Sequence, residues 1–276
     1  MTISVQTNVA ALVALQNLNK TASDLNDAQN QISTGLAIST AKDNASVWAI
    51  AQGQRAEVGA LAAVKSSLDR ASSIADVAQT AGASVSDLLN QIKQKVVAAQ
   101  DPSLDATSRS LINNDFQSLL SQITDVVNNA QFDGANLLDG SLSGNISFLA
   151  NADATSFITL SSQNMSLGNT IITMASTDTI STLTAAQAVL TEVNASIVNV
   201  NSALGNIGAQ ASQVQAHNTF VSKLSDVLTT GIGNLVDADM AKESARLQAL
   251  QVQQQLGVQA LSIANSAPQI ILSLFK

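Results

Sequence analysis

The sequence predicts a mainly α-helical fold, in which long antiparallel helices form a rod and a terminal coiled coil, with a small β-hairpin region in a central insertion. Apolar residues recur at helical spacing near both ends of the chain. The hydrophobic share is 46% while aromatic residues make up only 3%, which favours thin helix packing over a thick globular core. One central stretch alone combines turn dipeptides with short β-prone runs.

The first helix is expected over residues 8–36, and its apolar residues form one stripe because they recur in steps of three, four or seven. They are Leu18, Ala22, Leu25, Ile32 and Leu36. The C-terminal helix carries a heptad seam, with steps of four, three, four and three. Its members are Leu256, Ala260, Ile263, Ala267 and Ile270. Each terminal helix therefore needs a partner for its stripe.

Three further helices are expected between the terminal ones. The first runs over about 43–100, until Asp101-Pro102 ends it, because proline removes a donor and restricts the residue before it. The second is "SRSLINNDFQSLLSQITDVVNNA", and the third covers about 183–233. The glycine pairs in "GNIG" at 205–208 and "GIGN" at 231–234 indicate interruptions of that last helix.

Residues 131–184 differ in kind from the rest of the chain. Asp133-Gly134 and Asp139-Gly140 are turn dipeptides, and "NISFLA", "SFITL" and "NTIITMA" are short β-prone runs, so we expect hairpins. Residues 141–184 contain no Lys, Arg, Glu or His and are rich in Ser and Thr. This stretch is therefore a neutral, hydroxyl-rich insertion between two helical halves.

Charge and targeting features exclude several classes of partner. The net charge is −8, and no cluster of Lys and Arg offsets it, so nucleic-acid binding is not expected. The chain has no cysteine, which excludes disulfides and thiol chemistry. Residues 1–30 lack the features of a cleavable secretory signal, and no apolar run is long enough to span a bilayer.

No group of residues indicates catalysis. His217 is the only imidazole, so a site with two histidines is impossible. Asp133 and Asp139 lack the closely spaced oxygen ligands of a calcium loop. The acidic residues at 237, 239 and 243 lie beside Lys242 and Arg246, which indicates a salt-bridge face. We therefore expect no catalytic residue, no metal site, no cofactor and no enzyme activity.

Both ends and the centre resemble bacterial flagellin. The N-terminal "TNVAALVALQNLNKTASDLNDAQNQISTGLAISTAKDNASVWAIA" is similar to the family's opening. The C-terminal "NLVDADMAKESARLQALQVQQQLGVQALSIANSAPQIILSLFK" is similar to its final segment, and "AQFDGANLLDG" to its turn motif. The chain departs from common family residues at Ala37, Asn44, Val47-Trp48 and Gln91.

The resemblance implies a structural subunit that self-assembles into the helical flagellar filament for swimming. Residues 1–40 and 235–276 would form an inner coiled-coil domain, and residues 41–234 an outer rod domain with a solvent-facing insertion at about 131–184. The implied partners are other copies of the chain, the flagellar cap and hook-associated proteins, the type III export apparatus and an export chaperone. The implied location is the extracellular filament, reached without a cleaved signal peptide.

Two sets of residues carry the predicted functions. The predicted assembly seam consists of Leu18, Leu25, Ile32, Leu36, Leu256, Ala260, Ile263, Ala267 and Ile270. Several flagellins carry O-linked sugars on the exposed insertion, so its hydroxyls are candidates for the same modification. They are Thr155, Ser156, Thr159, Ser161, Ser162, Thr170, Thr173, Ser176, Thr177, Ser181 and Thr182. The alternative is that these are simply β-prone surface residues.

Two other functions compete with the filament subunit. A hook-filament junction protein would share both terminal helices but form only a short ring. A secreted membrane-active translocator could insert its apolar tail, but residues 270–275 are too short to span a bilayer and lack Trp and Tyr.

Overall fold

The computed structural model describes residues 7–142 and 144–273, and for residues 267–273 it describes the backbone only. The chain divides into two compact units: unit 1 consists of residues 1–56 and 227–276, and unit 2 of residues 57–226. The sequence-predicted domain boundaries at residues 40 and 235 both fall within unit 1. Which segments line the inside of a filament stays a prediction.

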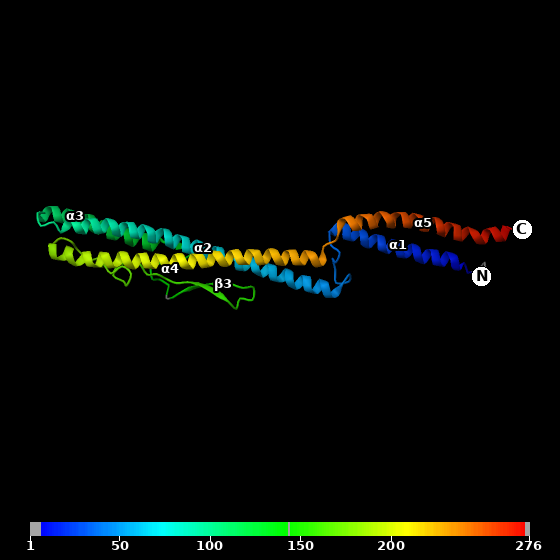
Figure 1. The fold of residues 1–276 in the computed structure, drawn as a ribbon, viewed down its shortest axis with the longest axis horizontal. Coiled ribbons are helices and arrows are strands. Elements are labelled where there is room, and N and C mark those ends of the chain that lie inside the picture. The colour runs from blue at the N-terminus through cyan, green and yellow to red at the C-terminus, as the bar shows by residue number, and fades with distance from the viewer. Residues whose placement is uncertain (1–6, 143, 274–276) are drawn as a thin grey trace. The chain divides into compact units, whose positions relative to one another are not determined.

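The described residues form five helices and four short strands (Figure 1). The helices are α1 (Val9–Thr34), α2 (Ala45–Ala99), α3 (Ala106–Asn129), α4 (Leu183–Val236) and α5 (Met240–Ser273). The strands are β1 (Gln131–Phe132), β2 (Ala135–Asn136), β3 (Ile146–Leu149) and β4 (Phe157–Leu160). The predicted fold class, mainly helical with a small β-hairpin region, is confirmed.

Helix α1 has well-defined ends. Asn8 caps its N-terminus, because the Asn8 side chain accepts a hydrogen bond from the backbone N–H of Ala11 at 3.1 Å. Gly35 ends it in the left-handed region, with φ of +71°, and its N–H donates to the carbonyl of Gln31 at 2.9 Å. Leu36 was predicted as part of the helical stripe, but it lies beyond the helix and forms a β-bridge with Asp237.

The connection between α1 and α2 is organised by one carboxylate. Asp43 Oδ2 accepts hydrogen bonds from the backbone N–H groups of Ser39 (3.0 Å) and Thr40 (2.9 Å), and from both of their hydroxyls. The hydrogen bond from the Thr40 backbone is the main cause that lowers the pKa of Asp43 below its ordinary value. The charged form of Asp43 therefore stabilises this connection.

We expect Asp43→Ala to loosen residues 35–44, because it removes the common acceptor of four donors. Hydrogen exchange measured by mass spectrometry should show several-fold faster exchange of the Ser39 and Thr40 amides at neutral pH. In the wild type the stabilisation is present above the ordinary aspartate pKa and is lost as the pH falls through the lowered one. Lys42→Ala, at an exposed neighbouring position, should leave exchange unchanged; equal exchange in both variants would contradict the role given to Asp43.

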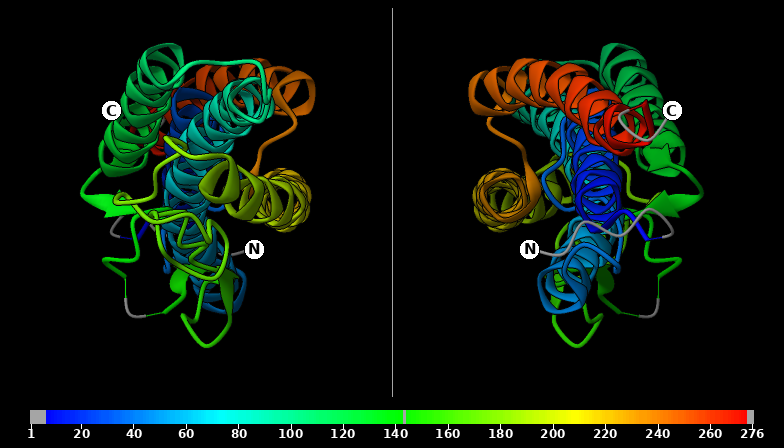
Figure 2. Two further views of the ribbon diagram at one scale, coloured as in Figure 1. Left: turned by 90° about the vertical axis from the view of Figure 1, so that its left-hand side faces the viewer. Right: turned by 90° about the vertical axis from the view of Figure 1, so that its right-hand side faces the viewer.

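Unit 2 is built on a continuous heptad seam along α2. The seam residues are buried and follow one another in alternating steps of three and four along the helix, which is the pattern of knobs-into-holes packing. They are Leu61, Val64, Leu68, Ala71, Ala75, Ala78, Gly82, Val85, Leu89, Ile92, Val96 and Ala99. Asp105 caps the N-terminus of α3, because its side chain accepts a hydrogen bond from the Ser108 N–H at 2.7 Å. Helix α3 buries Phe116 and Leu120. Figure 2 shows these helices roughly along the long direction of Figure 1, with α4 seen nearly end-on.

Helix α4 runs antiparallel to α2, with Ser86 bonded to Asn201 and Gln100 bonded to the carbonyl of Ala186. Its seam follows the same three-and-four steps. The seam residues are Ala186, Val189, Val193, Ser196, Val200, Ala203, Ile207, Gln210, Val214, His217 and Val221. Three of them are polar, and each one hydrogen-bonds the backbone of the central segment.

The central segment from residue 144 to 182, termed the strap, is pinned to the helices rather than free. Ser196 Oγ accepts from the Thr173 N–H (3.1 Å), Gln210 Oε1 accepts from the Ser161 N–H (2.8 Å), and the His217 Nε2–H donates to the carbonyl of Ala150 (2.7 Å). These bonds explain the polar seam positions of α4, because each satisfies a strap backbone group that would otherwise be left unpaired.

The strands only partly match the expected hairpins. β1 and β2 pair across Asp133-Gly134, both at positive φ as a two-residue hairpin turn needs, and β3 pairs antiparallel with β4. The run "NTIITMA" at 169–175 was expected to be β-structure, but within the described residues it forms only a single bridge, between Leu167 and Ile172. Its backbone is bonded instead to α4 side chains, and Ile172 is fully buried.

The predicted interruption of α4 at its glycines was wrong. Gly205, Gly208, Gly231 and Gly233 all lie inside the continuous helix Leu183–Val236. Each interior glycine costs a helix about 1 kcal/mol relative to alanine. Packing of the long seam against α2 outweighs that cost, which a local propensity argument does not include.

Candidate assembly surface

Helices α1 and α5 of unit 1 pack antiparallel as a two-helix pair (Figure 1). Leu25 and Ala28 of α1 are buried against Leu250 of α5. Near the ends of the chain, the Asn8 Nδ2 donates to the carbonyl of Ala264 at 2.7 Å. The pair is therefore fixed at both ends by a small apolar cluster and a side-chain bond.

One glycine sets the closeness of the pair. A Cβ atom at Gly257 would lie 3.2 Å from Leu18 Cδ1, so the missing side chain lets α1 approach α5. Apart from Glu243 in the first turn, the described α5 side chains that are buried or half-buried recur in steps of three and four, in line with Gly257. They are Leu247, Leu250, Gln254, Gly257, Leu261 and Ala264. This row is the seam that α5 uses within one chain.

The α1 residues and the α5 residues of the predicted assembly seam differ in burial. On α1, Leu18 and Ile32 are half-buried and Leu25 is buried. On α5, Leu256, Ala260 and Ile263 are exposed, with Leu256 at 58% and Ile263 at 70%. Ala267 and Ile270 belong to the helical backbone, but their side chains lie outside the described residues.

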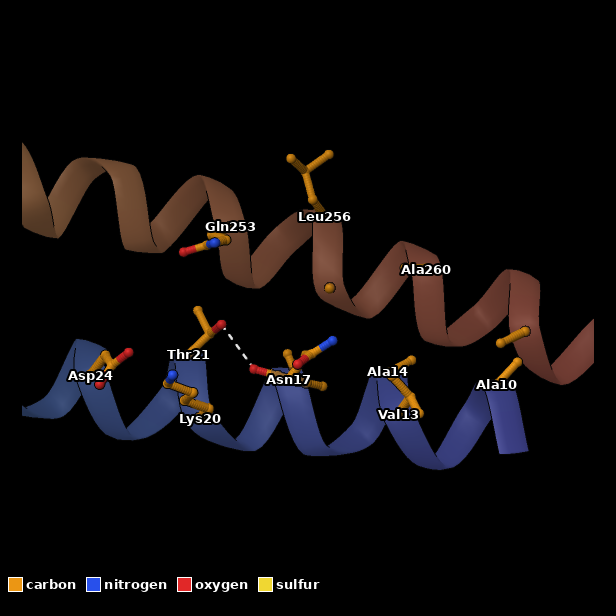
Figure 3. Close-up of a pocket in the computed structure, with 13 residues that line it drawn as sticks. Ala10, Val13, Ala14, Asn17, Lys20, Thr21, Asp24, Gln253, Leu256 and Ala260 are labelled. Carbon is orange, nitrogen blue, oxygen red and sulfur yellow. Dashed lines mark hydrogen bonds between the residues drawn. The ribbon is translucent and has the colours of Figure 1, made fainter. Parts of the chain in front are cut away.

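A groove of about 770 Å³ lies beside the α1 and α5 pair (Figure 3). Its lining mixes small apolar residues, such as Ala14 and Ala260, with polar ones, such as Asn17, Lys20 and Asp24. In Figure 3 the Leu256 side chain points away from α1. A second hollow, of about 410 Å³, is lined by residues that include Leu12, Leu15 and Leu261.

Further apolar residues of unit 1 are exposed beyond the predicted seam. On the two terminal helices they are Val9, Leu12, Val13, Leu15, Met240, Val252 and Val258. Helical periodicity did not predict them, because it identifies one apolar stripe on each helix. The sequence feature that indicates these residues is an excess: α1 and α5 carry more apolar residues than one seam can bury. Exposed apolar residues gathered on two packed helices indicate a candidate interaction site.

The candidate glycosylation residues are nearly all on the surface of unit 2. All are exposed except Ser161 and Ser162, which are half-buried. Several hydroxyls are already hydrogen-bonded, those of Thr155, Ser162, Thr173, Ser181 and Thr182. Among these candidates, the exposed hydroxyls that make no hydrogen bond within the described part of the chain belong to Ser156, Thr159, Thr170, Ser176 and Thr177.

The acidic residues near the start of α5 have structural roles. Asp239 caps α5, because its Oδ1 accepts from the N–H groups of Ala241 and Lys242. Glu243 lies 3.5 Å from Arg246, one helical turn further on. In the part of the chain that the structure describes, no three acidic or histidine side chains are grouped as metal ligands. No helix within residues 7–142 and 144–273 has the length and hydropathy to cross a membrane.

Comparison with known proteins identifies the family. The bacterial flagellin N-terminal helical region matches residues 5–143, and the C-terminal helical region matches residues 190–275. Flagellin FljJ of Caulobacter vibrioides is 56% identical over 278 residues, covering 100% of this chain and 99% of the relative. A flagellin of Brucella melitensis is 40% identical over 281 residues, covering 99% of both chains.

A solved structure shares the fold. A putative flagellar hook-associated protein from Vibrio parahaemolyticus superposes with a TM-score of 0.56 over 71% of this chain and 100% of its own, at 15% sequence identity. Identity at that level shows a shared fold alone. The family matches and the full-length relatives carry the assignment: this chain belongs to the bacterial flagellin family, the structural subunits of the flagellar filament.

Proposed function

We propose that unit 1 is the element through which copies of this chain polymerise. One observation carries this proposal: α1 and α5 bury one seam against each other and still expose a second apolar row that includes Leu256 and Ile263. A neighbouring copy that packs on this row would bury it. The predicted assembly seam is then shared, its α1 part within a chain and its α5 part between chains.

The energetics favour assembly over an isolated chain. Burying an exposed Leu or Ile side chain contributes about 1.5–3 kcal/mol. Each copy offers many such residues, so the total exceeds the cost of immobilising a subunit, which is roughly 4–15 kcal/mol. When copies contact one another head to tail and the contacts do not close into a ring, they produce an open helical polymer. Residues 1–40 and 235–276 would then form the inner coiled-coil domain, and residues 41–234 the outer domain.

Truncation tests the proposed role of α5. The full chain should polymerise when purified and induced to do so, and a variant lacking residues 262–276 should remain a helical monomer, because it loses Ile263 and the end of the exposed row. Sedimentation and electron microscopy measure polymer, and circular dichroism measures helix. Filaments of normal length from the truncated chain would sink the proposal.

The remaining partners follow from the same surface. The flagellar cap and hook-associated proteins would contact the ends of the polymer, where unit 1 is left uncovered. An export chaperone would cover the exposed row of α5 before assembly, during passage through the type III export apparatus. The chain would reach the extracellular filament without a cleaved signal peptide, and its role would be structural, with no enzyme activity.

We also propose O-linked sugars on the strap. The exposed hydroxyls without a hydrogen bond are the most accessible acceptors, and residues 141–184 carry few charges that would keep a polymer surface solvated.

The intact mass of filament protein from the native organism tests both the sugars and the uncleaved N-terminus. We expect a chain that starts at Met1 or Thr2, with sugar increments on peptides that contain Ser156, Thr159, Thr170, Ser176 or Thr177. A mass equal to that of the unmodified sequence would eliminate the sugars. A chain that starts well inside the sequence would contradict export without cleavage.

A further inference from the structure

Two Asp-Gly dipeptides give the chain a chemical reactivity that needs no enzyme. They are Asp133-Gly134 and Asp139-Gly140. The backbone nitrogen that follows an aspartate can attack the aspartate Cγ, and a glycine nitrogen does so most easily because glycine has no Cβ to obstruct the approach. The new C–N bond closes a succinimide ring. The carboxyl loses its hydroxyl and the nitrogen loses its proton, so one water leaves.

Water then opens the succinimide at one of its two carbonyl carbons. Attack at Cγ restores aspartate. Attack at the backbone carbonyl carbon gives isoaspartate, in which the chain continues through Cγ and the former backbone carbonyl becomes a free carboxylate. Isoaspartate has the mass of aspartate, because the water that left has been replaced. The reaction therefore needs no oxidant, no co-substrate and no catalyst.

The contacts of Asp139-Gly140 oppose ring closure. Asp139 Oδ1 accepts from the Ser141 N–H at 2.8 Å and from the Ser141 hydroxyl at 2.6 Å. The Asp139 carbonyl accepts from Ser166 Oγ at 3.1 Å. A Cβ atom on Gly140 would collide with Asn164 Nδ2, so the Gly140 backbone packs closely against the strap. Several contacts must therefore break before this carboxyl can meet the glycine nitrogen.

Asp133-Gly134 has far fewer contacts. Both residues are exposed, the Asp133 side chain at 59%, and no atom lies within 4 Å of a Cβ built on Gly134. The Gly134 N–H, which is the attacking group, makes no hydrogen bond within the part of the chain that the structure describes. Its nitrogen can therefore attack without breaking such a bond.

The hairpin that holds this turn is also short. Strands β1 and β2 have two residues each, and among the described residues no third strand joins them. A two-stranded hairpin is only marginally stable in water, so this one opens locally at little cost. Local opening lets the backbone reach the angles that ring closure requires.

One neighbour of Asp133 opposes the reaction. Arg70 Nη1 of α2 lies 3.4 Å from Asp133 Oδ2, and the Arg70 guanidinium lies over the Phe148 ring, 5.9 Å from its centroid. Ring closure breaks this ion pair, because the reacting carboxyl is neutral and must turn toward the Gly134 nitrogen. Both partners of the pair are more than half exposed, so the pair is weak and slows the reaction without preventing it.

We propose that Asp133 is a site of spontaneous isoaspartate formation, slowed by Arg70, and that the contacts of Asp139 spare the second dipeptide. The product adds one carbon to the backbone of a two-residue turn. Turn length sets the register of a hairpin, so the pairing of Phe132 with Ala135 is lost in the modified chain. Isoaspartate at this position accumulates with the age of each copy.

Storage of the purified full-length chain tests the proposal. After several weeks at neutral pH, electron-transfer fragmentation of peptides that cover residues 131–142 distinguishes isoaspartate from aspartate at equal mass. We expect at least about fivefold more isoaspartate at Asp133 than at Asp139, because the folded chain opens more easily at the first turn. In chain unfolded by urea, the two positions should react at similar rates, because both are followed by glycine.

Two variants locate the chemistry, with circular dichroism to confirm the fold. Asp133→Glu keeps the charge but needs a larger ring, so product at this position should disappear while product at Asp139 stays the same. Arg70→Gln should raise product at Asp133 by up to about fivefold, which is the contribution of an exposed ion pair, and leave Asp139 unchanged.

Three results would overturn parts of the proposal. Equal isoaspartate at both positions of the folded chain would show that the contacts of Asp139 do not protect it. A preference for Asp133 that persists in urea would assign the difference to local sequence instead of the fold. No increase at Asp133 in a folded Arg70→Gln variant would contradict the role of Arg70.

Discussion

Replacing Leu256 and Ile263 together by Asp is expected to abolish filament formation and to leave the monomer folded. The two side chains are 58% and 70% exposed in the chain by itself, so folding does not bury the new charges. In the polymer each Asp would be buried against apolar surface, at a cost of several kcal/mol for each unpaired charge. A loss of about 4 kcal/mol raises the concentration needed for assembly roughly 1,000-fold.

The measurement is the amount of protein that sediments after induced polymerisation, with circular dichroism to confirm the helix content. Leu111→Asp with Val198→Asp provides the matched control, because these residues of unit 2 are 63% and 64% exposed. We expect the Leu111 and Val198 double variant to form filaments. Normal assembly of the Leu256 and Ile263 variant would contradict the role of the exposed row of α5.

The second large effect is expected at Asn136, one of the few buried polar residues among those described, at 3% exposure. Its Nδ2 donates to the carbonyl of Val127 at 2.7 Å, and its Oδ1 accepts from the Leu138 N–H at 2.8 Å. The side chain thus ties the end of α3 to the segment after β2. Asn136→Ala leaves the buried Leu138 N–H unpaired, at about 1–3 kcal/mol, and removes the bond to the Val127 carbonyl, which still accepts from the Ala130 N–H, at about 1 kcal/mol.

We therefore expect Asn136→Ala to lower the free energy of unfolding by about 2–4 kcal/mol, measured by urea denaturation of the monomer. Asn129→Ala is the matched control, since Asn129 also donates to a backbone carbonyl at 2.7 Å but is exposed. Its expected cost is below about 1 kcal/mol. Equal losses in the two variants would show that burial of the Asn136 bonds is unimportant.

The long helices could be predicted from the sequence because their heptads are nearly unbroken. The α2 seam from Leu61 to Ala99 keeps steps of three and four throughout, and tertiary packing follows that pattern directly. The α4 seam has polar interruptions at Ser196, Gln210 and His217. Periodicity cannot explain them, because their partners are backbone groups of a strap whose course depends on the finished packing.

The face of α5 that packs against α1 could not be predicted from the sequence, for a different reason. Helix α5 carries two rows of residues along neighbouring faces. Hydrophobicity predicts that the row with Leu256 and Ile263 packs against α1. The fold instead turns the row with Gln254, Gly257 and Leu261 toward α1. Gly257 is a poor apolar residue but permits close approach, and a pattern based on hydrophobicity gives it no weight.

Some of the β-prone runs form strands and one does not, for a similar reason. Asp133-Gly134 specifies a hairpin locally, because both residues adopt positive φ. The run at 169–175 has the same local preference for β-structure, but its backbone groups are satisfied by Ser196 and Asn199 of α4. A strand needs a partner strand, and local sequence does not reveal when side chains of a helix take that place.

A helical reconstruction by electron cryomicroscopy, from filaments of the purified full-length chain, would show which surfaces the copies bury against one another. We predict α1 and α5 at the inner wall of a tube, with Leu256 and Ile263 buried between neighbouring copies and the strap on the outside. Filaments in which those two side chains face solvent, or in which unit 1 forms the outer surface, would contradict this prediction.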